Sequence, residues 1–160
     1  MIFDEAIGDR ARFIQVPIDS QNHSVFFDPG QYVSQPNITP LGDGYLLVYT
    51  AIGPFPDYLH DIYAAIDLDG QDMFDGGPIS LIKSGGEVVD YPQADPDSNI
   101  LYYTRNGAIF KIEYKVENAQ ITLIRPANAS PRGELVIAAG PTREAIYFDV
   151  GFMDTFFEIK

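Results

Sequence analysis

Cysteine is absent from the 160 residues of this chain, which excludes disulfides, thiolate metal sites and cysteine nucleophiles. The absence leaves the compartment open, because many secreted proteins also lack cysteine. Basic residues are scarce: 10 Lys and Arg stand against 23 Asp and Glu, giving a formal net charge of -13. Because so acidic a surface repels phosphate backbones, we expect no nucleic-acid partner.

Long apolar runs are missing as well. No stretch approaches the roughly 20 apolar residues of a transmembrane helix, and the first residues, MIFDEAIGDR, lack the basic start and apolar run of a secretory signal. We therefore expect a soluble protein without a membrane span, of unknown localisation. The sequence also contains no G-x-S-x-G or P-loop pattern, so neither serine-hydrolase nor nucleotide-binding chemistry is predicted.

The residues that are abundant favour strands and turns. Tyr (10), Phe (11), Gly (14) and Pro (12) are frequent, and the hydrophobic content of 46% is enough for a core. The run YLLVYT, Tyr45–Thr50, is apolar at successive positions. This pattern predicts a strand in a sheet that is covered on both faces. We predict an all-β protein.

Two segments of the chain resemble each other, Gln35–Gly70 and Tyr91–Val116. The corresponding positions are separated by 56, then 54, then 47 residues: Pro36 with Pro92, Tyr49 with Tyr103, and Ile62 with Ile109. The separation shrinks because the loop Ile52–His60 of the first segment is replaced by the short Arg105–Gly107. Loop variation on a fixed strand pattern is how repeated units diverge.

Each unit is predicted to contain four antiparallel strands, which gives tandem four-stranded blades. The first two units are residues 31–86 and 87–130, and a third, 131–160, would be completed by residues 1–30 within a single domain. Beyond the inner strands near Pro36 and Pro92, the predicted strands are Arg12–Ile18, Ser24–Asp28, Tyr45–Thr50, Asp61–Asp67, Pro78–Lys83, Ile100–Thr104, Ala108–Val116, Ala119–Arg125, Gly133–Ala139, Ala145–Val150 and Thr155–Ile159.

The repeat resembles the TolB-type β-propeller unit. Its first copy carries QPNITPLGDG (Gln35–Gly44), then an apolar strand, then DIY (Asp61–Tyr63) and DLDG (Asp67–Gly70), while the second has Glu113–Lys115 where Asp-Leu-Asp is expected. The resemblance implies a partial β-propeller and no particular activity. About three blades are too few to close a ring of roughly four to eight. The chain is therefore a fragment, an open stack or part of an assembly.

The loop Ile52–His60 is the candidate binding site. It is long, stiffened by proline, and contains Phe55, Tyr58 and His60. Such a loop is typical of a recognition surface, because aromatic side chains on a rigid backbone give contact area at low entropic cost. The alternative is that Phe55 and Tyr58 cover the edge of the blade.

Two other groups of residues resemble functional sites, a metal site and a glycosidase site. Asp67–Asp75 gathers oxygen ligands of the kind that calcium requires, but Asp-Gly turns at strand ends are common for backbone reasons, so we predict no metal and no cofactor. Ser34–Thr50 also resembles the first inner strand of arabinanase-type propeller glycosidases, with Gln35 where the general-base Asp is expected. A glutamine amide cannot accept and return that proton. The nearby Asp28-Pro29 is ordinarily a turn.

These observations favour a non-enzymatic binding or assembly module that presents its loops to a protein partner or to other subunits. The alternative is a carbohydrate-binding or glycosidase-like propeller. Because the outer faces of a short stack would be apolar, we expect them to be buried against a second copy or a partner, with Phe13–Phe27 and Ile146–Phe157 near the contact.

Overall fold

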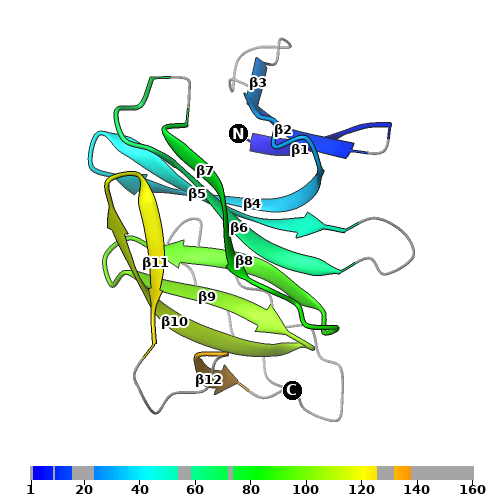
Figure 1. Cartoon of the computed structure of the whole chain (residues 1–160), viewed down its shortest axis with the longest axis vertical. Helices are drawn as coiled ribbons and strands as arrows, with labels where there is room; N and C mark the ends of the chain where they lie inside the picture. The colour runs from blue at the N-terminus through cyan, green and yellow to red at the C-terminus, as the bar shows by residue number, and fades with distance from the viewer. Residues whose placement is uncertain are drawn as a thin grey trace, which may run out of the picture.

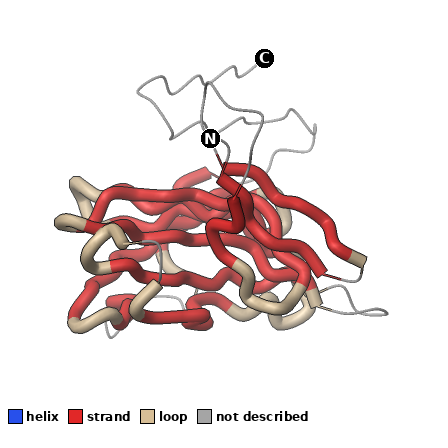
Figure 2. Tube along the Cα trace, turned by 90° about the horizontal axis from the view of Figure 1, so that it is seen from above, coloured by secondary structure: helices blue, strands red, loops and turns tan. Residues whose placement is uncertain are grey.

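Strands and turns build the described part of the chain. The computed structural model describes residues 2–8, 10–15, 24–53, 59–71, 74–125 and 132–137. Within these ranges there is no helix, and none therefore that could cross a membrane (Figure 2). The strands are β1 (Ile2–Ile7), β2 (Arg10–Gln15), β3 (Ser24–Phe27), β4 (Tyr32–Leu41), β5 (Gly44–Ile52), β6 (His60–Asp67), β7 (Gly76–Ile82), β8 (Val89–Asp95), β9 (Ile100–Arg105), β10 (Ala108–Glu117), β11 (Gln120–Ile124) and β12 (Glu134–Ile137).

The strands form three antiparallel sheets, which confirms the all-β prediction. The N-terminal sheet has the order β1-β2-β3, the central sheet β4-β5-β6-β7, and the distal sheet β8-β9-β10-β11, with β12 also pairing with β10. The two sequential sheets predicted from the repeat are present, with boundaries within a few residues of those expected, but the distal sheet has five strands instead of four because β12 joins it. β1 was not predicted. Figure 1 shows the three sheets as successive layers along the long axis.

Much of the predicted third unit, residues 131–160 completed by 1–30, lies outside the described residues. The predicted strands Ala145–Val150 and Thr155–Ile159 fall there. Of the described portions, β12 pairs with β10 and so joins the distal sheet, with a register shift between Ile109 and Phe110, and β1 to β3 form a sheet of their own. The boundaries of a third unit stay a prediction.

The central sheet is buried on both faces, as the YLLVYT pattern predicted. Leu46 and Val48 join the core shared with the distal sheet, whereas Leu47 and Tyr49 join the core shared with the N-terminal sheet; all four are 0% exposed. Full burial of such an apolar side chain is worth about 1.5–3 kcal/mol. The alternation along β5 therefore holds the three layers together.

The two repeats place corresponding aromatic side chains in the same cross-strand position. Tyr49 lies opposite Tyr63 and stacks on it with ring centroids 6.1 Å apart. Tyr103 lies opposite Phe110 and stacks at 5.7 Å. The internal similarity read from the sequence is therefore a repeat of structure, with the offsets of 54 and 47 residues taken up in loops.

The two equivalent tyrosines differ in how their hydroxyl groups are satisfied. The Tyr49 hydroxyl is buried without a hydrogen-bond partner in the described part of the chain, and desolvation raises its pKa above the ordinary value. The Tyr103 hydroxyl donates to the backbone carbonyl of Arg132. A buried hydroxyl without a partner destabilises the folded state by about 1–3 kcal/mol.

We therefore expect Tyr49→Phe and Tyr103→Phe to change stability in opposite directions. Tyr49→Phe raises the free energy of unfolding by about 1 kcal/mol because it removes an unsatisfied group, whereas Tyr103→Phe lowers it by about 1 kcal/mol because it removes the hydrogen bond to the Arg132 carbonyl. Urea unfolding of the two variants measures both changes. Changes of the same sign would contradict this account of the two hydroxyls.

Candidate binding surface

A bulge interrupts the first strand of the central sheet and the first strand of the distal sheet at the same place. In β4 the residues Gln35 and Pro36 together oppose Tyr49, and in β8 Tyr91 and Pro92 together oppose Tyr103. Gln35 and Tyr91 have φ angles of 55° and 52°, the left-handed region that residues other than glycine rarely adopt. A bulge re-aims the side chains around it, and such backbone strain persists only where neighbouring contacts hold it.

The side chain of Gln35 holds both bulges together. Its Oε1 accepts a hydrogen bond from Thr50 Oγ1 at 2.8 Å and a second one from the Tyr91 amide at 2.9 Å. The first bond fixes Gln35 to its own sheet, and the second fixes the bulge of the distal sheet. The left-handed backbone of Tyr91 is thus stabilised by a residue from the preceding repeat.

His60, a predicted site residue, joins the two sheets at the same end of the molecule. It begins β6, and its Nδ1 lies 2.6 Å from Asp90 Oδ1 in β8. The two side chains are 25% and 13% exposed. His60 was predicted as a loop residue free to contact a partner; the structure places it in a contact between repeats. Phe55 and Tyr58 lie outside the described residues.

Exposed apolar side chains surround this contact. Leu59 precedes His60 and is 41% exposed, Val88 is 52% exposed, and Tyr91, next to Asp90, is 57% exposed. We call the five residues Leu59, His60, Val88, Asp90 and Tyr91 the bulge-end surface. Val88, Asp90 and Tyr91 are not among the site residues predicted from the sequence.

Ion pairs and hydrogen bonds fix the segment before β8. Arg105 Nη1 lies 2.5 Å from Glu87 Oε2, and its Nη2 donates to the Lys83 carbonyl at 2.9 Å. Lys83 Nζ donates to Asp61 Oδ2 at 2.8 Å, and this bond raises the pKa of the lysine. The bulge-end surface is therefore carried by a constrained backbone, which lowers the entropy lost when a partner binds.

No family model matches this chain, and no curated protein or solved structure is significantly similar to it.

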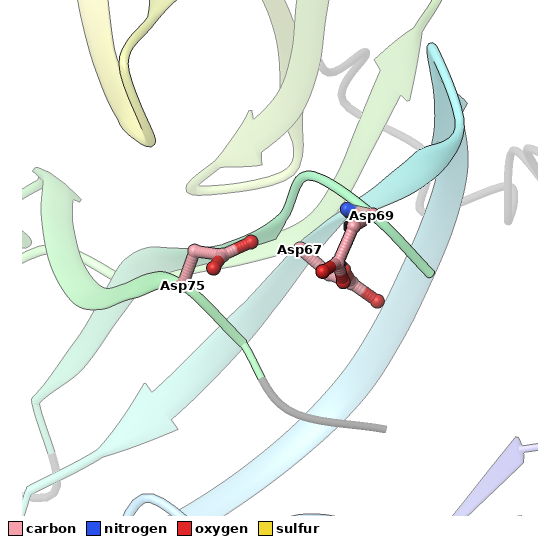
Figure 3. Close-up of side chains that lie close together, drawn as sticks. All are labelled: Asp67, Asp69 and Asp75. Atoms are coloured by element: carbon pink, nitrogen blue, oxygen red, sulfur yellow. Dashed lines mark hydrogen bonds between the residues drawn. The ribbon is translucent and has the colours of Figure 1, made fainter. Parts of the chain in front are cut away.

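The predicted carboxylate cluster forms in part, at the opposite end of the strands from the bulges. Carboxylate oxygens of Asp67, Asp69 and Asp75 lie within 4.8 Å of one another (Figure 3). These carboxylates accept backbone hydrogen bonds: the Asp69 and Gly70 amides donate to Asp67, at 3.0 and 2.8 Å, and the Leu68 amide donates to Asp75 at 2.7 Å. These bonds brace the turn between β6 and β7, and the expectation that the cluster holds no metal stays a prediction.

Gln35 and Asp28, the two residues considered above for glycoside hydrolysis, both accept hydrogen bonds. Gln35 carries an amide whose oxygen is already bonded twice. Asp28 Oδ1 accepts from the Gly30 amide at 2.9 Å, the pattern of a turn. Asp61, near the bulge-end surface, accepts from Lys83 and from the Ser84 amide. These contacts stabilise turns and the bulges, and the expectation that the chain does not hydrolyse glycans stays a prediction.

Proposed function

We propose that this chain is a non-enzymatic binding module and that the bulge-end surface recognises a protein partner. The observation that carries the proposal is Tyr91, an exposed aromatic residue at the start of β8 whose left-handed backbone is held by Gln35. Strained backbone of this kind is found more often at functional sites, where surrounding contacts hold it in place.

The composition of the surface supports a protein partner. Tyrosine is enriched at the centres of protein interfaces because it buries a large area with few rotatable bonds, and here Leu59 and Val88 add apolar area beside it. The His60–Asp90 pair supplies polar atoms within the same surface. The predicted recognition loop, which contains Phe55 and Tyr58, leads into it at Leu59.

A partial propeller is the arrangement that we propose for the repeats. Its support is the contact between β4 and β8, the first strands of the two units, which are bridged side by side by polar side chains. In such an arrangement the loops at one end of the blades form a common surface. In our proposal the bulge-end surface is that common surface.

The test replaces two exposed tyrosines, one at each end of the strands, in separate variants. Tyr91→Asn removes the aromatic ring while keeping a residue that tolerates the left-handed backbone. Tyr45→Asn is the matched control, since Tyr45 is 41% exposed but lies at the other end of the sheets. After capture from a native extract and identification by mass spectrometry, we expect the Tyr91 variant to bind the partner at least tenfold more weakly and the Tyr45 variant to bind it normally.

Equal binding by the Tyr91 and Tyr45 variants would contradict the proposal. A glycan array probed with the same proteins addresses the carbohydrate alternative. Glycan binding that requires Tyr91 would replace the protein partner by a saccharide, because an exposed aromatic face beside polar groups also suits a sugar ring.

A further inference from the structure

His60 and Asp90 form a hydrogen-bonded pair in which the position of the hydrogen can be assigned. Nδ1 of His60 lies 2.6 Å from Oδ1 of Asp90. An ionised carboxylate can only accept a hydrogen bond, so Nδ1 carries the hydrogen, and in the neutral imidazole the other nitrogen, Nε2, is then an acceptor. The contact with Asp90 therefore fixes which kind of group His60 can receive from a partner.

The Nε2 atom of His60 is accessible and makes no hydrogen bond within the described part of the chain. The side chain is 25% exposed. Among the described residues, the buried side-chain atoms that lack a partner are the Tyr49 hydroxyl and the Arg105 Nε, so Nε2 is not a buried atom. When the imidazole is neutral, the bulge-end surface thus presents an unused acceptor.

Asp90 differs from the neighbouring carboxylates because it contacts no Lys or Arg among the described residues. The other charged side chains around it are joined in ion pairs, Asp61 with Lys83 at 2.8 Å, and Glu87 with Arg105 and Arg132 at 2.5 and 3.1 Å. On β5, the residue opposite His60 is the uncharged Ile52. The Asp90 side chain is only 13% exposed, and a carboxylate so far removed from water is stabilised by a nearby cation.

A proton on His60 and a cation from a partner are two alternative ways to compensate the charge of Asp90. Protonated imidazole supplies the positive charge itself, and its Nε2 becomes a donor. With neutral imidazole the pair keeps the negative charge of the carboxylate and offers an acceptor. Lys and Arg suit this state because they are both cations and hydrogen-bond donors, and the net charge of -13 attracts them to the chain.

We propose that the bulge-end surface binds a basic segment of its protein partner, with a Lys or Arg side chain donating to Nε2 of neutral His60. This inference rests on the proposed function and adds the chemistry of the partner and a dependence on pH. The exposed ring of Tyr91, next to Asp90, offers an aromatic face for a cation in the same surface. Protonation of His60 removes the acceptor and adds a repelling charge, so binding weakens as the pH falls through the range of about 5 to 8 in which histidine gains its charge.

NMR of the free protein tests the assigned position of the hydrogen. The sequence contains two histidines, so His23→Gln leaves His60 as the only imidazole. Long-range nitrogen–proton correlation spectra at about pH 7.5 are expected to show a protonated Nδ1 and an unprotonated Nε2. A neutral form that carries the hydrogen on Nε2 would overturn the proposal, because no acceptor would then face the partner.

Two capped tripeptides, Gly-Arg-Gly and Gly-Gln-Gly, are the probes for the basic group, and the amide signals of Asp90 and Tyr91 report their binding. We expect the arginine peptide to bind about tenfold more weakly at about pH 5.5 than at about pH 7.5, and the glutamine peptide to shift neither signal. His60→Gln is the matched variant, since a glutamine side chain can bond to Asp90 and present an acceptor but does not titrate. Arginine-peptide binding to this variant should not change with pH.

The outcomes separate this inference from the proposed function. If the arginine peptide does not bind, or if its binding depends on pH equally in His60→Gln, the basic partner is excluded. A loss of partner capture in Tyr91→Asn together with that result would keep the binding surface and remove its basic ligand. If His60→Gln does not fold, the hydrogen position and the pH profile of the chain with His60 decide.

Discussion

Replacing Gly76 with alanine is expected to lower the free energy of unfolding by about 3 kcal/mol, near the upper end for overpacking a core. Gly76 begins β7, and a Cβ placed there would lie 2.1 Å from the Ala119 carbonyl oxygen and 3.1 Å from the Ala119 Cβ. Ala119 belongs to the tight turn between β10 and β11 in the distal sheet, with a φ of 56°. Because the obstacle is backbone, the two sheets must move apart to relieve the clash.

Gly42→Ala is the matched control for this variant. Gly42 lies in the turn between β4 and β5 of the same sheet and has a φ of 60°, but nothing lies within 4 Å of a Cβ placed there. Its substitution should lower stability by only about 1 kcal/mol, the strain of a left-handed alanine. Urea unfolding of both variants distinguishes the loss of stability caused by the close contact with Ala119 from the loss caused by a strained backbone. Equal losses would show that the sheets do not meet at Gly76.

The second large effect is expected at the polar contact between the two repeats. Asn37→Ala should lower the free energy of unfolding by about 2–3 kcal/mol, because it removes the partner of the Ala94 amide as well as that of Gln93. Ala94 is only 3% exposed, so water cannot readily replace the lost acceptor. The loss combines a broken hydrogen bond with the desolvation of a buried donor.

Gln93→Ala removes the same side-chain pair from the other side and serves as the comparison. It leaves the Ala94 amide bonded to Asn37, so the expected loss is about 1 kcal/mol. Chemical denaturation of the two variants gives the difference. If Gln93→Ala were as destabilising as Asn37→Ala, the bond to the Ala94 amide would contribute nothing, and the contact between β4 and β8 would need another explanation.

The candidate surface was only partly accessible to prediction. His60 was selected because it ends an aromatic, proline-containing loop, but its partner, Asp90, is 30 residues away in a different sheet. Tyr91 was visible only as the residue before a repeated proline. That position marks a bulge in both repeats, yet it holds Gln35 with a bonded side chain in one repeat and an exposed tyrosine in the other. A repeat pattern predicts the backbone conformation, but it does not predict which residues each side chain contacts.

The sequence by itself determined the all-β class, the strands of the two repeats and the burial of β5 on both faces. These features follow from local rules: alternation of side chains, β-branched and aromatic content, and turn residues such as Asn106-Gly107. Only the tertiary structure decided which faces meet, because the stacking of sheets depends on contacts between distant residues. Gly76 approaches Ala119, Tyr49 packs under Phe13, and Gln35 reaches Tyr91. Each of these joins segments whose proximity no local pattern encodes.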